Sequence, residues 1–541
     1  MTLADISTSS IWVVVALATW LPAWSFGLVR DLHILQLEEY ENGRFLRWWF
    51  AQTRSVVRLL PVGTLLILSL LSLPGVGPGF LLILAAIGAA LANLVLVRRR
   101  GKHPAKKPLA WTARAKRLFG IAIGLSAVVM MAVGWVAPEQ FRLFAVLLTT
   151  GMLLLISGPW LCGANLVARP VEASIRRYYL VQAGRRLREV GPVVVGITGS
   201  HGKTSTKEIV AALLAAKDET LKPPGSYNTL MGVCLTINRW LERRHRFFVV
   251  EMGAYGPGDI KALCDLVHPD AGILTAIGPE HLERFGSLEN TERAKYELIE
   301  ALPAVGFAVM NVDDERVRHL ADSTRHVRVV RYGLLEDGMP EITADRIETG
   351  PDGISFDVVR GDERFAVRSS LLGRHNVSNL LAGIALALEL DISPDQISRA
   401  VPRISAPDHR LQLIRTPGGA TIVDDAYNAN PAGVKAALDV LAEMTSGRKV
   451  LVTPGMVELG AVEAAENRRF GELAAAVCDT VVLVGPARTA PIREGLLGTG
   501  FPEKQIVSVR SLAEVTERLP SLAGAGDVVL FCNDLPDQYA E

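Results

Sequence analysis

Residues 196–206 read Gly-Ile-Thr-Gly-Ser-His-Gly-Lys-Thr-Ser-Thr and decide how the second half of the chain folds. The apolar run Pro192 to Val195 comes directly before them, and the helix-like stretch Glu208 to Ala216 follows. A glycine-rich turn between a strand and a helix is typical of a phosphate-binding loop. The sequence therefore predicts a nucleotide site between this strand and this helix.

The residue types in this loop suit a nucleoside triphosphate. Gly199 and Gly202 let backbone N–H groups approach phosphate oxygens, and Lys203 supplies a cation for the terminal phosphates. The Thr204 hydroxyl can reach Mg²⁺, and Ser205 follows it at the start of a helix whose dipole favours an anion. We expect ATP and Mg²⁺ to bind here.

Short apolar runs alternate with helical stretches from Val193 onward, which indicates an α/β architecture with largely parallel sheets. Residues 340–372 instead read as short alternating strands with Gly-Asp turns, so we expect a β-ribbon there. The runs expected as strands are Arg246 to Val250, Ala271 to Ala276, Phe307 to Met310, Thr421 to Val423, Val450 to Val452, Thr480 to Val484 and Val528 to Phe531.

Charge is divided unevenly along the 541 residues. Residues 1–190 carry 21 Lys and Arg against 8 Asp and Glu, whereas the remainder carries 36 against 48. The acidic part has no basic tract interleaved with aromatic residues, so a nucleic-acid partner is not expected. A basic and apolar first part suits a membrane instead.

The cysteines are odd in number and widely spaced, and no Cys-x-x-Cys pair occurs. This pattern argues against both a disulfide framework and a zinc site. We expect reduced and mostly buried thiols at Cys162, Cys234, Cys264, Cys478 and Cys532.

Five apolar stretches of spanning length predict a helical transmembrane domain over residues 1–170. Only the second stretch contains a charge, Arg58, which lies close enough to its end to reach the interface. The last stretch is long enough to tilt or to extend beyond the bilayer. The five stretches are about Ile11 to Val29, Val56 to Leu73, Phe80 to Val97, Leu118 to Ala137 and Leu143 to Ala168.

The loops between these stretches predict the orientation. Residues 98–117 hold nine Lys and Arg and no acid, whereas residues 74–79 hold no charge. Basic loops stay in the cytoplasm, so we expect a bacterial-type cytoplasmic membrane, with the N-terminus outside and everything after Arg169 inside. The first cytoplasmic loop, residues 35–50, reads as an interfacial helix, with a substrate-binding element as the alternative.

Three polar residues after the phosphate loop are candidates for the chemistry. Glu251 ends the apolar run Phe247 to Val250, where a carboxylate can hold Mg²⁺ beside a nucleotide. His281 follows the next expected strand, and Lys295 lies 14 residues further on in a helix-like stretch. Taken alone, His281 also reads as a surface histidine and Lys295 as a salt-bridged helical lysine.

A series of motifs from about Val193 to the C-terminus resembles the Mur ligases in order and spacing, and most resembles the type that adds D-alanyl-D-alanine, the MurF type. The pairing of Asp-x-Tyr-Asn-Ala-Asn-Pro with Met-x-Glu-Leu-Gly is the specific part of this resemblance. The motifs are Thr198 to Thr206, Tyr227 to Gly232, Glu251 to Gly253, His281 with Lys295, Gly373 to Asn379, His409-Arg410, Asp424 to Pro431 and Pro454 to Gly460.

The resemblance implies a central ATPase domain at residues 191–405 and a C-terminal Rossmann-like domain at residues 406–541, which closes over the nucleotide. A linker helix at residues 171–190 would join them to the transmembrane domain. The implied catalytic residues are Lys203, His281 and Lys295.

The resemblance also implies ligand roles. Thr204 and Glu251 would hold a first Mg²⁺ and His281 a second, together with a carbamoylated Lys295 whose added carboxylate replaces a repelling ammonium. Asn376 and Asn379 would face the adenine side, and Arg410 and Asp425 would reach phosphate and ribose. The motif residues expected on the substrate side are Asn228, Tyr427, Asn428 and Asn430.

The expected activity is ATP-dependent amide ligation in cell-wall precursor synthesis, through an acyl phosphate. The expected partners are a muramoyl-peptide or other carboxylate acceptor, UDP-linked or lipid-linked, an amino acid or dipeptide amine, and membrane lipid. A ligase for another envelope polymer, such as poly-γ-glutamate, is an alternative. An ATP-driven transporter and an inactive nucleotide-binding scaffold are alternatives of a different class.

Overall fold

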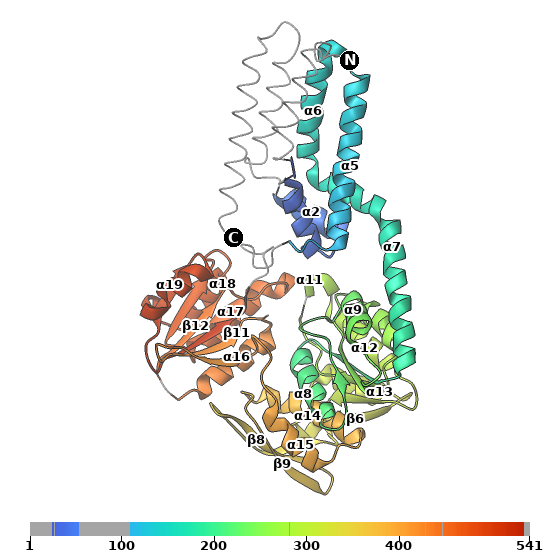
Figure 1. Ribbon diagram of the computed structural model, residues 1–541. Coiled ribbons are helices and arrows are strands. Elements are labelled where there is room, and N and C mark those ends of the chain that lie inside the picture. Colours follow the sequence, from blue (N-terminus) through green and yellow to red (C-terminus); the bar gives the residue numbers. More distant parts are fainter. Residues whose placement is uncertain are drawn as a thin grey trace. The chain divides into compact units, whose positions relative to one another are not determined.

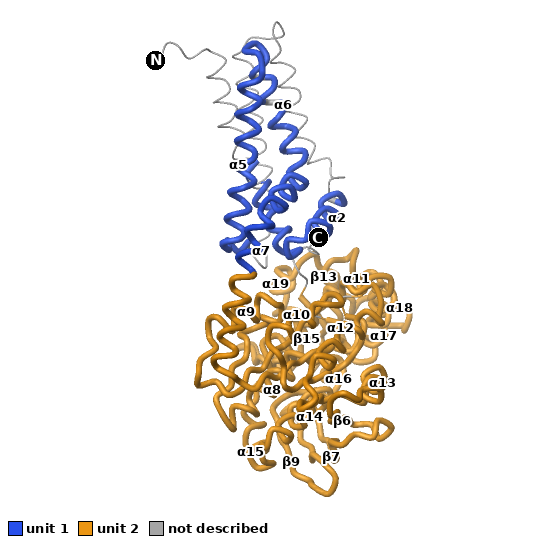
Figure 2. Tube along the Cα trace, turned by 90° about the vertical axis from the view of Figure 1, so that its right-hand side faces the viewer, with its two compact units in different colours: residues 1–176, 536–540 blue, residues 177–535, 541 orange. Residues whose placement is uncertain are grey.

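The computed structural model describes residues 24–25, 27–52, 109–280, 282–427, 429–445 and 447–534. The chain divides into two compact units, residues 1–176 with 536–540 and residues 177–535 with 541 (Figure 2). The described part of the first unit is helical, whereas the second contains two large sheets and a β-ribbon (Figure 1).

The first unit is tied together by polar contacts between its helices. The Ser157 hydroxyl donates to the Asp31 carboxylate at 2.7 Å, and Arg117 donates to both oxygens of Glu172 at 2.7 and 3.0 Å. Part of the predicted helix at residues 35–50 is present as α2, and its interfacial position stays a prediction. Residues 27–37 are also helical, and the named elements are α2 (Asn42–Gln52), α5 (Ala113–Val136), η2 (Glu139–Phe141), α6 (Arg142–Leu155) and α7 (Ser157–Val190), which continues into the second unit.

Within the described residues, α5 is long and apolar enough to cross a membrane, and a second span exists only if α6 and α7 count as one. These two helices meet at an 82° bend, so the predicted stretch Leu143 to Ala168 is not one continuous helix. The bend has a local cause, because Pro159 has no N–H to continue α6 and suits the first turn of α7. The first three predicted spans lie outside the described residues, except for Trp24, Ser25 and residues 27–29.

A six-stranded parallel sheet, in the order β2-β3-β1-β4-β5-β6, forms the centre of the second unit. Alternate residues of β1 enter the cores on its two faces, as expected for a strand buried on both sides. Val195 and Ile197 belong to the core of α8 and α14, whereas Val194 belongs to the core of α9, α10 and α12. The strands are β1 (Val193–Thr198), β2 (Thr220–Leu221), β3 (Phe247–Glu251), β4 (Ala271–Leu274), β5 (Phe307–Asn311) and β6 (Arg328–Tyr332).

The helices of this region cover both faces of the sheet, as Figure 1 shows. They are α8 (Lys203–Ala215), α9 (Leu230–Trp240), α10 (Asp259–Val267), α11 (Leu282–Phe285), α12 (Leu288–Glu300), α13 (Glu315–Ser323), η3 (Glu336–Gly338), α14 (His375–Glu389), α15 (Pro394–Ala400) and η4 (Val401–Arg403). The expected β-ribbon is present as three antiparallel strands, β7 (Thr343–Gly350), β8 (Gly353–Arg360) and β9 (Glu363–Ser369).

A second six-stranded sheet, in the order β10-β11-β15-β12-β13-β14, organises the C-terminal region. It is parallel except for β10, which pairs antiparallel with β11. All seven apolar runs expected as strands are confirmed across the two sheets, and the five cysteines are buried free thiols as expected. The elements are β10 (Gln412–Arg415), β11 (Thr421–Asp425), α16 (Pro431–Glu443), β12 (Lys449–Thr453), η5 (Gly460–Val462), α17 (Glu463–Ala475), β13 (Thr480–Val484), α18 (Ala490–Gly498), η6 (Glu503–Gln505), β14 (Ile506–Val509), α19 (Leu512–Leu522) and β15 (Val528–Cys532).

Helices α17 and α18 lie in backbone contact through one glycine on each. A Cβ at Gly471 would lie 2.1 Å from the Ile492 carbonyl oxygen, and a Cβ at Gly495 would lie 2.0 Å from that of Arg468. No side chain fits at either distance, so the two glycines allow the close approach of these helices.

Candidate active site

The phosphate loop joins β1 to α8 and needs glycine at two positions. Gly199 has a φ of 146° and Gly202 a φ of 82°, which L side chains rarely adopt. A Cβ at Gly199 would also lie 2.0 Å from the Thr275 hydroxyl oxygen. The glycines therefore keep the loop close to the neighbouring strand and leave its backbone uncovered.

The first turn of α8 provides the donors that a phosphate requires. Gly202 is the N-cap and offers no side chain to the helix, so N–H groups of the first turn lack the usual capping acceptor. Thr204 and Ser205 are half-buried in this turn, where their hydroxyls remain accessible. The helix dipole adds partial positive charge at the same place, which favours an anion.

The segment after β4, residues 275–280, is fixed to the phosphate loop by hydrogen bonds. The Ser200 backbone N–H donates to the Ala276 carbonyl at 2.7 Å, and the Ser200 hydroxyl donates to the Gly278 carbonyl at 3.0 Å. The Thr275 hydroxyl donates to the His201 carbonyl at 2.5 Å. This segment therefore holds its last residue, Glu280, in a defined place beside the loop.

Lys203 forms an ion pair with Glu280. Its Nζ lies 2.9 Å from Glu280 Oε2 and also donates to the carbonyls of Gly199 at 2.6 Å and Ser200 at 3.0 Å. Both charged side chains are only 12% exposed, so solvent screens the pair weakly. Phosphate oxygens placed at this loop would compete with the Glu280 carboxylate for Lys203.

This competition predicts that Glu280→Gln lowers the KM for ATP by about three- to tenfold, because about 1 kcal/mol of competing attraction is removed. The kcat is expected to stay within about twofold, since Lys203 is left intact. Steady-state kinetics with ATP as the varied substrate measure both quantities, with the exposed Glu289→Gln as the matched control. An unchanged or higher KM in the Glu280 variant would contradict the competition.

Glu251 ends β3 and offers one oxygen for a metal ion. Its Oε1 accepts a hydrogen bond from Asn228 Nδ2 at 3.0 Å. Its Oε2 is buried without a hydrogen-bond partner, and the nearest cation is Lys207 Nζ at 3.5 Å. A buried carboxylate oxygen without a hydrogen bond is costly, and it is a suitable ligand for a hard cation such as Mg²⁺. The residues present therefore fit the predicted Mg²⁺ site.

Lys295 is a buried amine on α12. The Ser287 hydroxyl caps this helix by accepting from the Asn290 N–H at 3.2 Å, and the Lys295 Nζ lies 5.6 Å from the centre of the Phe285 ring. Burial lowers the pKa of Lys295 to about 7, and the Lys203 charge lowers it further against the opposing carboxylates. A large fraction of the amine is therefore neutral near pH 7, which makes it nucleophilic.

Asn376 and Asn379 lie at the start of α14 and form a chain of hydrogen bonds. Asn376 Nδ2 donates to the Leu372 carbonyl at 2.8 Å, and Asn379 Nδ2 donates to Asn376 Oδ1 at 2.9 Å. The Thr206 hydroxyl of α8 reaches Asn379 Oδ1 at 3.5 Å. The two asparagines therefore brace the phosphate loop, and their contact with adenine stays a prediction.

Residues of the C-terminal region meet the central region at Tyr427. Its hydroxyl hydrogen-bonds the Ser226 hydroxyl, and the Arg410 guanidinium lies 4.4 Å from the centre of its ring. Burial raises the pKa of Asp425 to about 7, although Arg410 opposes the shift. Arg410 and Asp425 are therefore close together, while their roles toward phosphate and ribose stay predictions.

Asn430, His281 and Asn428 complete the set of predicted site residues. Asn430 caps α16, because its Oδ1 accepts from the Gly433 N–H at 2.9 Å, and this gives it a structural role. His281 and Asn428 lie outside the described residues.

Sequence reasoning missed Lys207 and Glu280. Lys207 lies one helical turn after Lys203 and is 1% exposed, and its Nζ donates to the Gly225 carbonyl at 2.7 Å. Its spacing within the phosphate-loop helix is a signal that could have identified it. Glu280 immediately precedes His281, but only the geometry shows that it pairs with a lysine 77 positions earlier.

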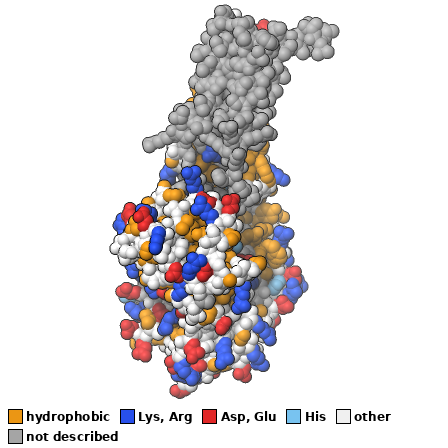
Figure 3. Space-filling view, turned by 90° about the vertical axis from the view of Figure 1, so that its left-hand side faces the viewer, with side chains coloured by type: hydrophobic (Ala, Val, Ile, Leu, Met, Phe, Trp, Pro, Cys, Tyr) orange, Lys and Arg blue, Asp and Glu red, His pale blue; other side chains and the backbone are white. Residues whose placement is uncertain are grey.

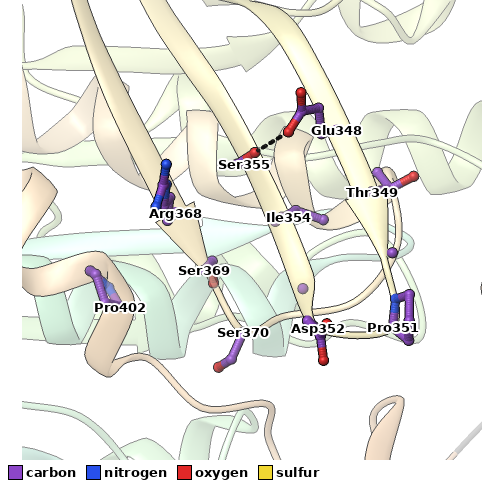
Figure 4. Close-up of a pocket in the computed structure, with 12 residues that line it drawn as sticks. Glu348, Thr349, Pro351, Asp352, Ile354, Ser355, Arg368, Ser369, Ser370 and Pro402 are labelled. Carbon is purple, nitrogen blue, oxygen red and sulfur yellow. Dashed lines mark hydrogen bonds between the residues drawn. The ribbon is translucent and has the colours of Figure 1, made fainter.

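A separate pocket of about 490 Å³ lies at the turn between β7 and β8 (Figure 4). The Ser355 hydroxyl donates to Glu348 within it at 3.2 Å, and Arg368, Ser369 and Ser370 form the opposite side. None of the predicted catalytic or ligand-binding residues lines this pocket. The predicted residues around the phosphate loop and Glu251 instead lie at the carboxyl edge of the central sheet, which is therefore the candidate active site.

A phosphate loop, a buried carboxylate suited to Mg²⁺ and a second Rossmann-like sheet are the features of an ATP-using enzyme. Residues 197–387 match the Mur ligase middle domain, and residues 409–533 match the Mur ligase, glutamate ligase domain. The chain belongs to the Mur ligase family. It is an ATP-dependent, ADP-forming carbon-nitrogen ligase.

Two relatives carry the name UDP-N-acetylmuramoyl-tripeptide–D-alanyl-D-alanine ligase. The Mycobacterium tuberculosis (strain ATCC 25618 / H37Rv) protein is 35% identical over 63% of this chain and 70% of its own length. The Escherichia coli (strain K12) protein is 33% identical over 66% of this chain and 80% of its own length.

Solved structures support the same fold. MurF from Acinetobacter baumannii has a TM-score of 0.60 and 25% identity, covering 67% of this chain and 78% of its own. The MurF ligase from Thermotoga maritima in complex with ADP has a TM-score of 0.59 and 26% identity, covering 68% of this chain and 81% of its own. The chain is therefore similar to MurF-type ligases in both sequence and structure.

Proposed function

We propose that this ligase joins D-alanyl-D-alanine to a muramoyl tripeptide in peptidoglycan precursor synthesis. The supporting observation is that proteins named for this reaction match 63% and 66% of the chain at 35% and 33% identity. These relatives favour the reaction over poly-γ-glutamate ligation, transport and an inactive scaffold.

The proposed chemistry requires positioning and charge rather than a covalent nucleophile. The tripeptide carboxylate attacks the γ-phosphate of ATP, ADP leaves, and an acyl phosphate forms. The dipeptide amine then attacks the acyl carbon, phosphate leaves, and the amine loses a proton as the amide forms. Lys203 stabilises the transferring phosphoryl group through its charge, and the N–H groups of α8 orient it.

Metal ions complete the proposed site. Mg²⁺ would neutralise charge on the phosphates when bound. Thr204 and Glu251 would hold the first ion, and His281 with a carbamoylated Lys295 would hold the second. The burial of the Lys295 amine supports this modification, because a neutral amine can add to CO₂ and release a proton to give a carboxylate.

The test uses detergent-solubilised full-length protein with ATP, Mg²⁺, D-alanyl-D-alanine and either a UDP-muramoyl tripeptide or its lipid-linked counterpart. Product mass and ADP release are measured together. A pentapeptide product with one ADP per product supports the proposal. ADP release without a pentapeptide from either acceptor would contradict it.

We further propose that the first part of the chain crosses a bacterial-type cytoplasmic membrane five times, with α6 and the start of α7 together as one bent span, and leaves the catalytic part in the cytoplasm. Apolar side chains of α5 that are exposed in the structure support contact with lipid: Val128 is 58% exposed, Met131 66% and Trp135 86%. The face of the second unit seen in Figure 3 instead mixes acidic and basic side chains.

Protease protection in inverted membrane vesicles tests this topology. A tag at the N-terminus is expected to be protected inside the vesicle, whereas a tag at the C-terminus is expected to be cleaved. Release of the protein by alkaline carbonate would contradict an integral membrane domain.

A lipid-linked acceptor is supported if the full-length protein uses it faster than the UDP-linked acceptor.

A further inference from the structure

Arg284 carries a buried donor that the structure leaves without an acceptor. It lies on the short helix α11, and its guanidinium carbon is 4.1 Å from the centre of the Tyr255 ring. Its Nη1 is buried and has no hydrogen-bond partner. Its Nη2 lies 3.9 Å from Glu458 Oε1, which is an ion-pair contact but too long for a hydrogen bond.

An unsatisfied guanidinium nitrogen is unusual inside a protein. Buried donors are nearly always paired, and the guanidinium stays charged at every physiological pH. The Tyr255 ring holds the guanidinium by a cation–π contact without using its N–H groups. The arrangement therefore fixes the planar group in place and leaves at least one N–H without an acceptor.

Arg284 also lies on the connection that follows the carboxyl end of β4. The helix α11 begins directly after the segment whose Glu280 pairs with Lys203, and Tyr255 follows Glu251 by four residues. Both positions follow the carboxyl ends of parallel strands, where ligands of open α/β sheets bind. The Glu283 N–H contacts the Glu458 carbonyl at 3.4 Å, which brings the C-terminal region against α11 at this point.

We propose that Arg284 binds a carboxylate of one of the two substrates. The five donors of a guanidinium match the two oxygens of a carboxylate, and a charge-assisted pair would satisfy the buried Nη1. This inference rests on the proposed function. The carboxylate is either the C-terminal group of the incoming dipeptide or a side-chain carboxylate on the third residue of the acceptor, distinct from the carboxylate that is activated.

The first comparison uses D-alanyl-D-alanine and D-alanyl-D-alaninamide, which differ only in the terminal carboxylate. The full-length wild type is expected to prefer the acid by about 10- to 100-fold in kcat/KM if Arg284 binds the dipeptide. Arg284→Met is expected to reduce that preference to within about threefold, and Arg284→Lys to retain part of it. The exposed Arg293→Met on α12 is the matched control and is expected to keep the wild-type preference.

The second comparison uses two UDP-muramoyl tripeptides, one with a carboxylate on the third side chain and one without. A preference for the carboxylated acceptor that is lost only in Arg284→Met would assign the site to the acceptor. ADP affinity, measured by calorimetry, is expected to be unchanged in the variant and so reports that it is folded.

Two results would overturn the inference. One is an Arg284→Met enzyme that retains every preference of the wild type for a carboxylate. The other is an equal loss of rate with carboxylated and uncarboxylated substrates, which would make Arg284 only a contact to Glu458. A wild type that ligates D-alanyl-D-alanine to neither acceptor would instead refute the proposed function, and this assignment would fall with it.

Discussion

Lys203→Ala is expected to lower kcat/KM for ATP-dependent ligation by at least about 10³-fold, because removing a preorganised charge from a phosphoryl-transfer site has effects of this size. Lys203 is the cation of the phosphate loop, and its Nζ lies within 2.6 Å of the Gly199 carbonyl at the centre of that loop. The measurement is the initial rate of ADP and amide formation over a range of ATP concentrations.

The control for this variant is Lys435→Ala on α16, which removes a surface lysine whose contact with Asp439 is 3.4 Å long. A surface pair of this kind contributes little, so its rate is expected to stay near that of the wild type. Circular dichroism at the assay temperature checks that the Lys203 variant is folded, because the substitution also removes the ion pair with Glu280. An enzyme that keeps more than about a tenth of its activity without Lys203 would remove this lysine from the mechanism.

Lys295→Ala is expected to lower kcat by about 10²-fold or more, because the carbamate that would hold the second metal ion is lost. A small carboxylate such as acetate can enter the space vacated by the side chain and supply the missing oxygens. Partial recovery of kcat with acetate is therefore expected in this variant and not in Lys203→Ala. Undiminished activity in Lys295→Ala would exclude the carbamate.

The pH dependence of this modification follows from the lowered pKa of Lys295, which is about 7. Only the neutral amine reacts with CO₂, so carbamate formation is expected to be slow at pH 6, where the ammonium predominates, and faster at pH 8. Enzyme depleted of CO₂ should therefore regain activity faster at pH 8 than at pH 6 when both samples are given the same concentration of dissolved CO₂. Exposed Lys261→Ala should behave as the wild type, and equal recovery rates at both pH values would contradict the mechanism.

The sequence pattern predicted the inner strands of the two large sheets and none of their edge strands. The four strands absent from the prediction are β2, β6, β10 and β14, which are the edge strands of the two sheets. Edge strands have one side open to water and carry polar residues, as in Arg328–Tyr332 and Gln412–Arg415. They therefore lack the continuous apolar run that marks a buried parallel strand.

The candidate site was predictable where one motif contains the chemistry. Lys203 and Glu251 could be predicted from the residues around them. Lys203 comes after one apolar strand and Glu251 ends another, and both lie where nucleotides bind in such a sheet. The pairing of Lys203 with Glu280 and the contact of Arg284 with Tyr255 depend on how separate loops meet in space. No local pattern contains that information, so only the structure shows them.

The contact between α17 and α18 restricts which residues fit at two positions of the chain. Any residue larger than glycine at position 471 or 495 would have to move a backbone carbonyl of the other helix, since the added atom would lie about 2 Å from it. Substitutions at the two positions are therefore coupled through one shared gap. Glycine at both positions therefore allows this close helix pair, and it lies in a stretch that contains none of the nucleotide motifs.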